Sequence, residues 1–554
     1  MCPILLHMYL REVVSPRKRG PDTRYLQLVE GERDAQGRVQ TRILHSFGRT
    51  DQLDLEQIRR LVDQLGRYLD PAVPPAAPGL EVTRTWTFGG THLLNSLWKE
   101  LGLDRFFSRA LEARAFAQPV ERALFALVAH RALAPASKLA CSRWAGAGAW
   151  IPGLDRGGAE IEVQHLYRAM DFLHAGMPDL QEHLYFQVTD LLSADVSVLF
   201  YDTTSVSFHL EQADPEGGLR RHGYSKKKRP DLPQIVVALA INRDGIPVRH
   251  WIYPGNRIDV STVEEVTRDL LGLRPRHFLF VGDRGMVSQA NLDFLESRRL
   301  KYLLGFPLRT DPALEAHLLS LRGRYRPVRE GLGVKETQID DGARTLRYLL
   351  CRSAARAERD ARTRATILER LGTALADRRK GAASGDTRAG RSLLSKPGYA
   401  RYLVKDADGK LRIDPARVRA AARHDGKYVL VTNELGLPAE ELVLGYRDLW
   451  KAERAFRSMK SVLDLEPVQH RTPERIAAHV HICVLAYLLI RVAENRAQAG
   501  WEQIREPLER ISLAELTTGR ASVLQTKALT STERDLLNCC KAPPPPKILQ
   551  ATTG

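Results

Sequence analysis

Two aspartates follow short apolar runs that have the composition of β-strands. Asp202 directly follows the run 197–201, and Asp283 lies just beyond the run 277–281. Strands joined by a right-handed crossover run parallel about 4.8 Å apart, so acids at their carboxyl ends converge. Converging carboxylates repel each other unless a hard divalent cation neutralises them. The pair therefore predicts a Mg²⁺ site, whereas a single aspartate at a strand end more often only caps or solvates it.

A third acid, Glu453, belongs to a set of polar side chains that recur every seven residues. Tyr446, Glu453 and Lys460 form this set, and at about 100° per residue they fall on nearly one face of a helix. Trp450 and Phe456 are expected to pack this helix on the sheet, while Glu453 reaches the metal and Lys460 a phosphate. A solvated face with chance spacing would explain the helix alone. The two aspartates favour a three-acid site.

The elements that must position these side chains are a mixed sheet and a long helix that begins soon after Pro438. After residue 193, helical periodicity gives way to short β-branched runs bounded by turns. Residues 242–245 form a hairpin signal between two of these runs. The predicted order is strand, strand, strand, helix, strand, helix and strand, over residues 197–201, 235–241, 246–253, 260–273, 277–281, 288–299 and 302–306.

The rest of the chain shows other patterns. Strand-like runs at 24–29 and 38–47 precede an amphipathic helix, whose apolar stripe is Leu55, Ile58, Leu61, Val62 and Leu65. Four prolines between 71 and 78 indicate a linker, and helical periodicity dominates 91–193. Further on we expect strands at 347–350 and 428–432, a basic helix at 354–377 and a loop rich in Gly, Ser and Arg at 381–391.

A length of 554 residues is enough for three or four domains. In chain order we predict a β-hairpin with a helix, a helical domain, the first part of the sheet, a basic β-rich insertion, C-terminal helices and a tail. Their expected bounds are 1–75, 80–193, 194–307, 308–437, 438–500 and 501–554.

Positive charge dominates the chain. Its 83 Lys and Arg residues exceed the 66 Asp and Glu residues, for a net charge of +17. Such an excess favours polyanions, because each neutralised phosphate releases counterions, although a merely basic enzyme would also show it. The segment 352–391 holds eleven basic and five acidic residues. Smaller clusters are Arg17, Lys18 and Arg19, and Lys226, Lys227, Lys228 and Arg229. Nucleic acid is the first partner expected.

Composition excludes several classes of protein. With 44% hydrophobic and 27% charged residues, the chain is not disordered as a whole. The longest apolar stretch, 482–490, is too short to span a bilayer, and residues 3–10 lack the pattern of a signal peptide. The six cysteines show no CxxC spacing, so neither a disulfide framework nor a zinc ribbon is indicated. We expect an intracellular protein with no membrane contact.

Taken together, these motifs resemble the bacterial insertion-sequence transposases of the DDE type, in the branch with a Tyr-Arg-Glu-Lys signature. The similar segments are FYDTT at 200–204, VGDRG at 281–285, YRDLWKAERAFRSMK at 446–460, DGKYVLVTN at 425–433 and PASKLA at 135–140. One position departs from the signature, which expects Arg where this chain has Leu449. Arg447, Lys451 and Arg457 are the alternatives for that contact.

The resemblance implies an RNase H-like catalytic core, interrupted by the insertion, in which Asp202, Asp283 and Glu453 bind two Mg²⁺ or Mn²⁺ ions. One ion would activate the attacking water or 3′-hydroxyl, and the other would stabilise the leaving oxygen. The implied partners are the terminal inverted repeats and target DNA, bound by a homodimer in the cytoplasm at the nucleoid. The insertion would contact transposon ends and assist hairpin formation. Expected DNA contacts are Tyr446, Arg457, Lys460, Lys226, Lys227, Lys228 and Arg229, although a solvated charge run would explain residues 226–229 equally well.

Two alternatives stay open at this stage. An inactive DNA-binding descendant of such an element would bind DNA without metal-dependent cleavage. A metal-dependent phosphatase or nuclease would act on substrates that lack specific ends. The intact acids argue against the first alternative, and the set Tyr446, Glu453 and Lys460 argues against the second.

Overall fold

The computed structural model describes fifteen stretches of the chain: residues 7–16, 22–33, 39–53, 81–112, 119–154, 161–191, 196–209, 212–225, 229–273, 278–340, 342, 344–380, 393–406, 410–518 and 521–553. These form two compact units, which comprise residues 1–81 and 82–554. Each unit is described by itself. The domain bounds predicted inside the second unit stay predictions.

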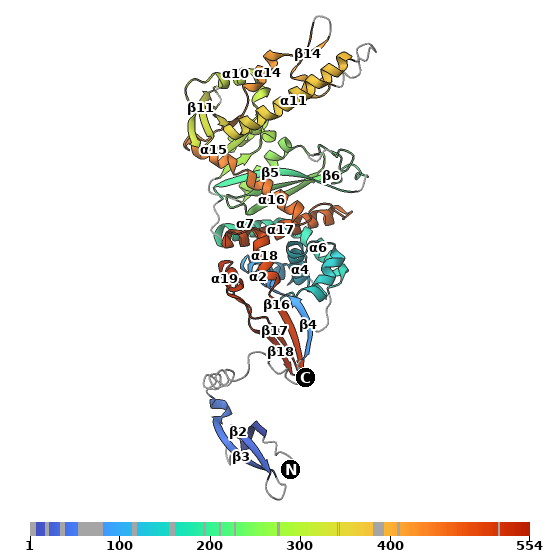
Figure 1. The fold of residues 1–554 in the computed structure, drawn as a ribbon, viewed down its shortest axis with the longest axis vertical. Helices are drawn as coiled ribbons and strands as arrows, with labels where there is room; N and C mark the ends of the chain where they lie inside the picture. The colour runs from blue at the N-terminus through green and yellow to red at the C-terminus, as the bar shows by residue number, and fades with distance from the viewer. Residues whose placement is uncertain are drawn as a thin grey trace. The chain divides into compact units, whose positions relative to one another are not determined.

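The first unit holds a three-stranded antiparallel sheet in the order β1-β2-β3 (Figure 1). Its elements are β1 (His7–Ser15), β2 (Thr23–Arg33), β3 (Val39–Arg49) and the short 3-10 helix η1 (Thr50–Gln52). β2 and β3 confirm the two strands predicted here. β1 was not predicted, because the adjacent charged pair Arg11 and Glu12 interrupts its apolar pattern. The predicted helix around Leu55, the proline-rich linker and the cluster at 17–19 lie outside the described residues.

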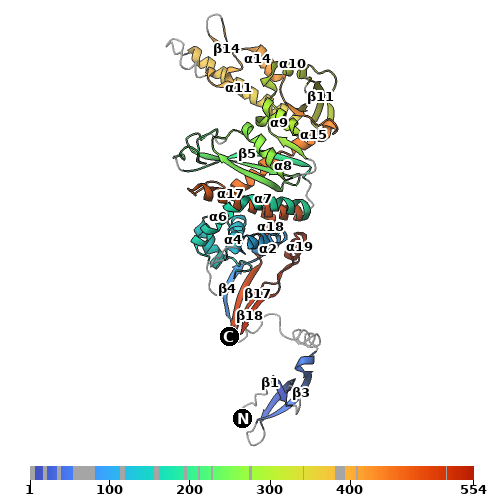
Figure 2. The same ribbon diagram turned by 180° about the vertical axis from the view of Figure 1, so that it is seen from behind.

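In the second unit, a helical layer precedes the large sheet in the chain. It contains α2 (Gly89–Glu100), α3 (Leu103–Glu112), α4 (Val120–Leu133), α5 (Lys138–Arg143), η2 (Trp144–Gly148), α6 (Val163–Ala175), α7 (Met177–Phe186) and η3 (Gln187–Leu191). These helices confirm the helical periodicity of 91–193. Apolar residues such as Leu94, Trp98 and Leu124 are buried in one core with α17 (Pro473–Ala497). In both views this layer lies between a four-stranded sheet and the large sheet (Figures 1 and 2).

The large mixed sheet has nine strands in the order β10-β11-β12-β15-β9-β8-β5-β6-β7. Its first segment comprises β5 (Val198–Ser207), β6 (Gln234–Ile241), β7 (Pro247–Pro254), η4 (Asp259–Thr262), α8 (Val263–Gly272), β8 (Leu279–Gly282), η5 (Arg284–Met286), α9 (Gln289–Ser297) and β9 (Lys301–Phe306). The predicted order of strands and helices is therefore confirmed. β6 and β7 form the predicted hairpin, while β8 runs parallel to β5 and β9.

Asp202 does not lie at the end of a strand, contrary to the sequence-based prediction. β5 continues past Asp202 to Ser207, because residues 203–207 remain paired with β6. The parallel neighbour β8 ends at Gly282, which pairs with Tyr201. Asp202 and Asp283 therefore occupy the next positions of two neighbouring strands, at the edge that the end of β8 creates.

The predicted insertion continues the same sheet. It contains η6 (Leu308–Thr310), α10 (Pro312–Ser320), β10 (Arg326–Arg329), β11 (Leu332–Asp340), β12 (Thr345–Ser353), α11 (Ala354–Lys380), α13 (Pro397–Ala400), β13 (Leu403–Lys405), β14 (Leu411–Ile413), α14 (Pro415–Ala422) and β15 (Lys427–Thr432). β15 pairs with β9 and β12 pairs with β15, so β10 to β12 extend the sheet. β12, β15 and α11 confirm the predicted elements, and the loop at 381–391 lies outside the described residues. A small separate core forms around Leu371, Tyr402 and Leu403.

The single long helix predicted after Pro438 is two helices. α15 (Ala439–Arg447) ends before Asp448, and α16 (Trp450–Ser461) begins after Leu449. Tyr446 therefore belongs to α15, while Glu453 and Lys460 belong to α16, so the three residues do not share one helix face. The break contains neither Gly nor Pro, and Leu449 is buried there. Tertiary packing thus determines this break.

The C-terminal region folds, although the sequence indicated only a tail. After α17 come α18 (Trp501–Glu509), β16 (Ser512–Thr518), β17 (Ala521–Thr526), α19 (Ser531–Cys539) and β18 (Ile548–Thr553). The three strands form a sheet with β4 (Glu81–Thr87), in the order β18-β17-β16-β4. Trp86, Trp150 and Leu513 are buried in its core.

The helix α17 is the apolar core helix of this unit. By length and composition alone, the helix is apolar enough to cross a membrane. Residues 482–490 by themselves are too short for this, so the longer helix that contains them was not recognised from the sequence. In the protein, 94% of its most apolar window is buried. The helix packs against α4 and α6 on one side and β7 on another, as a core helix of a globular protein does.

Buried histidines join α17 to the sheet. His250 Nε2 of β7 and His481 Nδ1 of α17 are 2.7 Å apart, and the ring of His174 from α6 stacks on His481. Burial is the main cause that lowers the pKa of His250 to about 3, with a contribution from Arg249. Burial also holds the pKa of His481 well below its usual value, helped by His250 and His174. Both imidazoles are therefore neutral in the folded protein.

We predict that the free energy of unfolding falls as the pH drops below about 6.5. The unfolded chain takes up protons at these histidines below that pH, whereas the folded chain does not until much lower pH. Each buried histidine adds a slope of about 1.4 kcal/mol per pH unit in this window. Urea unfolding of His250→Gln across the same window is expected to show a smaller slope. His317→Gln, at an exposed position, is the matched control, and equal slopes for both variants would contradict the prediction.

Candidate functional site

A cavity of about 980 Å³ opens where β8 ends beside β5. Asp202, Asp283, Glu453 and Tyr446 all line it. The insertion also contributes to its lining, mainly through α11 and the segments before α10 and after β10. The structure therefore brings the three predicted acids to one cavity, although they come from three separate parts of the chain.

The two aspartates present carboxylates at adjacent positions of parallel strands. Asp202 is half-buried, and its Oδ1 accepts a hydrogen bond of 2.8 Å from the amide of Thr203. Asp283 is exposed and caps η5, because its Oδ1 accepts a bond of 2.7 Å from the amide of Arg284. Each carboxylate is thus oriented by the next amide in the chain. Hydrogen bonds of this kind restrict the orientations that each side chain can adopt.

Glu453 reaches the cavity from α16, whose other face is fixed in the core. Ala452, Ala455, Phe456 and Met459 are buried, and α16 packs against β5 and β6. Phe456 therefore packs as predicted. Trp450 does not, because its side chain is 48% exposed and lines the cavity. Glu453 is exposed beside it.

Tyr446 approaches the sheet at Gly305 of β9. A Cβ at Gly305 would lie 2.4 Å from the Tyr446 hydroxyl and 3.1 Å from the amide nitrogen of Arg284, so only glycine leaves room for this contact. The Tyr446 ring also stacks on Tyr428 at 6.4 Å between centroids. Burial, followed by the nearby Asp283 carboxylate, raises the pKa of Tyr446 above its ordinary value. The neutral phenol is therefore an available hydrogen-bond donor at the edge of the acid site.

Lys460 is not among the residues that line the cavity. Its ammonium donates a hydrogen bond of 2.6 Å to the carbonyl of Ser205 in β5, and it lies 3.6 Å from Glu466 Oε1. This contact ties the end of α16 to the strand that carries Asp202. The expected phosphate contact of Lys460 stays a prediction.

The three alternatives for the missing signature arginine lie in different places. Arg447 is half-buried and lines the cavity with the acids. Lys451 points elsewhere, because it donates to the carbonyl of Arg243 at 2.7 Å and to Asp448 at 2.9 Å. Arg457 is exposed on α16 and does not line the cavity. Of these three side chains, only Arg447 shares the cavity with the acids.

The wall of the cavity is basic overall. Nine Arg and Lys side chains line the cavity against six Asp and Glu side chains, and two of the six are engaged within the insertion. Asp425 pairs with Arg364, and Asp360 accepts a bond of 2.9 Å from the amide of Gly426. Exposed arginines remain around the rim: Arg284, Arg309, Arg329, Arg356, Arg359 and Arg401.

This wall includes residues that the sequence analysis did not identify. Arg356 and Arg359 belong to the predicted basic tract at 352–391, and Arg356 lies over the ring of Tyr428 at 5.5 Å. Arg309, Arg329 and Arg401 were missed, because they are far apart in the sequence and only folding brings them to one cavity. Burial is the main cause that lowers the pKa of Lys427, and Arg352 and Arg423 lower it further.

The predicted basic loop between β5 and β6 is only partly described. Lys226, Lys227 and Lys228 lie outside the described residues. Arg229 is exposed and forms an ion pair of 2.6 Å with Asp231. Contacts of this loop with DNA stay predictions.

The donor chemistry of the acids fits a hard divalent cation. Carboxylate oxygens are the ligands that Mg²⁺ prefers, and two of the three acids sit on adjacent strand positions. Across the ranges that the structure describes, no three His, Cys, Asp or Glu side chains come close enough to hold one ion. The three acids therefore share a cavity without converging on a single point in this conformation.

Gly305 is a second residue that the sequence analysis missed, although a glycine inside a strand is a signal of close approach. We predict that Gly305→Ala lowers the free energy of unfolding by about 1–3 kcal/mol, because the new Cβ would overlap the Tyr446 hydroxyl. In a Tyr446→Phe background the hydroxyl is absent, and the nearest ring carbon lies 3.3 Å from the new Cβ. Gly305→Ala should therefore lower the free energy of unfolding by less in that background.

Chemical denaturation of the four proteins in this double-mutant cycle measures the difference. Gly445→Ala is the matched control, because a Cβ at that helical position meets nothing within 4 Å. An equal cost of Gly305→Ala in both backgrounds would argue against the proposed contact.

Comparison with known proteins identifies the family of this chain. Residues 194–489 match the transposase DDE domain, and residues 10–76 match the N-terminal domain of the IS1634 family transposases. No curated protein matches. A solved piggyBac transposase synaptic complex with hairpin DNA is similar with a TM-score of 0.33 and 11% identity, over 76% of each chain. Because the first match spans more than half of the 554 residues, this chain belongs to the insertion-sequence transposases of the DDE type.

Proposed function

We propose that this transposase cleaves DNA at the ends of its element and joins those ends to target DNA through a divalent-metal site formed by Asp202, Asp283 and Glu453. DDE transposases cleave DNA strands and transfer them. The observation that carries the residue assignment is that all three acids line one cavity together with exposed arginines. One site of this kind serves both cleavage and strand transfer, because both are displacements at phosphorus.

We assign the five strands β7, β6, β5, β8 and β9 to an RNase H-like core. Three consecutive antiparallel strands followed by two parallel ones support this assignment. In such a core the acids of the first and fourth strands lie side by side. The positions of Asp202 and Asp283 in the β5–β8 pair agree with that arrangement.

The chain's own residues would act as follows. Asp202, Asp283 and Glu453 would hold two Mg²⁺ or Mn²⁺ ions, which when bound activate the attacking oxygen and stabilise the leaving oxygen. Tyr446 would donate its phenolic proton in a hydrogen bond to a phosphate oxygen beside Asp283. Arg447 would take the role that the signature gives to an arginine at the position of Leu449, since it lines the acid cavity.

The basic wall would hold the phosphate backbone of the transposon end. Guanidinium groups match phosphate oxygens in two-pronged hydrogen bonds, and they act without regard to base sequence. Arg309, Arg329, Arg356, Arg359 and Arg401 line the same cavity as the acids, so a strand that enters the cavity would meet both groups of side chains. The shared lining supports contact between the insertion and DNA, and a role of the insertion in hairpin formation is a proposal from the family resemblance alone.

The remaining assignments are also proposals. Residues 1–75 and the helical region 80–193 would recognise the terminal inverted repeats, and two copies of the chain would pair the ends. Arg457, Lys460 and the loop residues Lys226, Lys227, Lys228 and Arg229 would make further phosphate contacts. The protein would act in the cytoplasm at the nucleoid. An inactive DNA-binding descendant remains the outcome to exclude.

We predict that Glu453→Gln lowers Mg²⁺-dependent excision by more than about a hundredfold, because the amide no longer offers a charged oxygen to the ion. The assay is excision from a plasmid that carries the element's own flanking DNA. Binding to those flanks should be unchanged. Glu441→Gln, an exposed carboxylate on α15 that does not line the cavity, is the matched control. Binding without excision by the unaltered protein would favour the inactive descendant.

We further predict that Arg359→Ala weakens DNA binding and reduces its dependence on salt. Loss of one phosphate contact should lower the slope of log affinity against log salt by about 0.9. Arg362→Ala is the matched control, because Arg362 does not line the cavity and pairs with Glu358 on the same helix. Fluorescence anisotropy over a salt series measures both slopes. Identical slopes for the two variants would remove α11 from the DNA interface.

A further inference from the structure

The short helix η4 is hydrogen-bonded to β5, the strand that carries Asp202, on the sheet face opposite to the Asp202 side chain. Tyr201 and Thr203 flank Asp202 and point to the opposite face of the sheet, as alternate residues of a strand do. The Tyr201 hydroxyl donates to Thr262 Oγ1 at 2.7 Å, and the Thr203 hydroxyl donates to Asp259 Oδ1 at 2.6 Å. Two hydrogen bonds therefore anchor the residues on both sides of Asp202.

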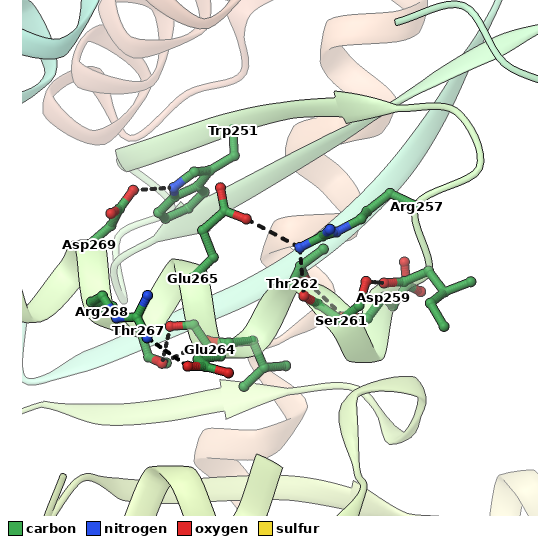
Figure 3. Close-up of polar contacts among 12 residues, drawn as sticks. Trp251, Arg257, Asp259, Ser261, Thr262, Glu264, Glu265, Thr267, Arg268 and Asp269 are labelled. Atoms are coloured by element: carbon green, nitrogen blue, oxygen red, sulfur yellow. Dashed lines mark hydrogen bonds and ion pairs between the residues drawn. The ribbon is translucent and has the colours of Figure 1, made fainter. Parts of the chain in front are cut away.

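The two anchors belong to one short element. η4 spans Asp259–Thr262, and Thr262 Oγ1 in turn donates to the carbonyl of Asp259 at 2.7 Å. Figure 3 shows Asp259, Ser261 and Thr262 side by side in this turn. Because the Thr262 side chain is bonded to the backbone of Asp259, a shift of the Asp259 backbone would also move Thr262.

The same element is joined to the segment that follows Asp283. The side-chain amide of Asn291, in the first turn of α9, donates to the carbonyl of Val260 and to that of Met286, each at 2.8 Å. Val260 belongs to η4 and Met286 to η5, while the amide of Met286 donates to the Asp283 carbonyl at 3.1 Å. The Asp259 carboxylate also lies 3.7 Å from where a Cβ of Gly285 would be.

Beyond Gly282, these side-chain hydrogen bonds take the place of backbone hydrogen bonds between β5 and β8. β8 pairs with β5 only as far as Gly282, so beyond that point no strand holds β5 on this side. Thr203, Thr262 and Asn291 are buried. Buried hydrogen bonds of this kind fix side chains rigidly, because a broken bond would leave an unsatisfied polar group in a medium of low dielectric constant.

We propose that Asp259 and Asn291 are positioning residues that set the separation of Asp202 and Asp283, and with it the affinity of the site for a divalent cation. The path runs from Thr203 through Asp259 and Val260 to Asn291, and from there through Met286 to Asp283. This inference rests on the proposed function of the two aspartates as metal ligands. Residues that orient metal ligands from behind change metal affinity by about 10- to 100-fold when they are altered.

The test measures binding of Mn²⁺ to the full chain without DNA, from the electron paramagnetic resonance signal of free Mn²⁺. Thr203→Val removes the hydroxyl with little change of shape, and we expect it to weaken Mn²⁺ binding about tenfold. Asn291→Ala removes both donated bonds and should have a similar effect. Thr203→Ser keeps the hydroxyl and should bind within about twofold of the unaltered protein.

The matched control is Thr267→Val. Thr267 is a buried threonine of α8, also visible in Figure 3, whose hydroxyl donates to the carbonyl of Val263 within its own helix. Its loss should lower the melting temperature as Thr203→Val does, while Mn²⁺ affinity stays unchanged. Equal weakening by Thr267→Val would mean that general destabilisation causes the effect, which overturns the proposal.

Asp202→Asn separates the failure of this inference from the failure of the proposed function. If Asp202→Asn abolishes Mn²⁺ binding while Thr203→Val and Asn291→Ala bind like the unaltered protein, the positioning role is overturned and the metal site stands. If Asp202→Asn binds Mn²⁺ with unchanged affinity, the metal site itself is overturned, and the positioning role with it. If Thr203→Val does not fold, Asn291→Ala decides the outcome by the same criteria.

Discussion

The parallel pairing of β5 with β8 places two like charges at neighbouring positions, and much of the structure around them follows from that constraint. Tyr201 pairs with Gly282, so Asp202 and Asp283 come next on their strands. Carboxylates at neighbouring positions repel each other, and a divalent cation would relieve this repulsion. The fold supports the pair from one face through η4 and Asn291, and leaves the other face open to the cavity. Rigid support on one side and access on the other are what a metal-dependent site needs.

The position of Glu453, the third acid, depends on where the chain returns from the insertion to the sheet. Because β15 pairs with β9, the chain comes back to the edge of the core before α15 and α16 begin. The break between these helices lets Tyr446 contact Gly305 while Glu453 reaches the same cavity from a separate helix. Lys460 then ties the end of α16 to Ser205 of β5. Residues of the insertion and of the core therefore line one cavity, which the arginines of α11 share with the acids.

Sequence patterns predicted what is local. The β5 to β9 segment was correct in order, because β-branched runs, the turn at 242–245 and the helical stripes are local signals. Non-local pairing was not predictable: β10 to β12 extend the sheet, and β16 to β18 pair with β4 from the other end of the chain. The helix break at Asp448 and Leu449 has no Gly or Pro to signal it, and the seven-residue spacing wrongly suggested one face. The three acids line one cavity, and their role as metal ligands stays a prediction; the arginines that line the same cavity become apparent only in the fold.

The central claim is that Asp202, Asp283 and Glu453 gather divalent ions in one place, and iron-directed cleavage of the protein tests it most directly. When hydrogen peroxide is added, Fe²⁺ bound in place of Mg²⁺ is oxidised to Fe³⁺ as it reduces the peroxide to hydroxide and a hydroxyl radical, and the radical cuts the nearest backbone. The account predicts fragments that end near residues 202, 283 and 453, suppressed by excess Mg²⁺ and absent in Asp202→Asn. Cuts at only one of these segments, or cuts that persist in Asp202→Asn, would contradict it.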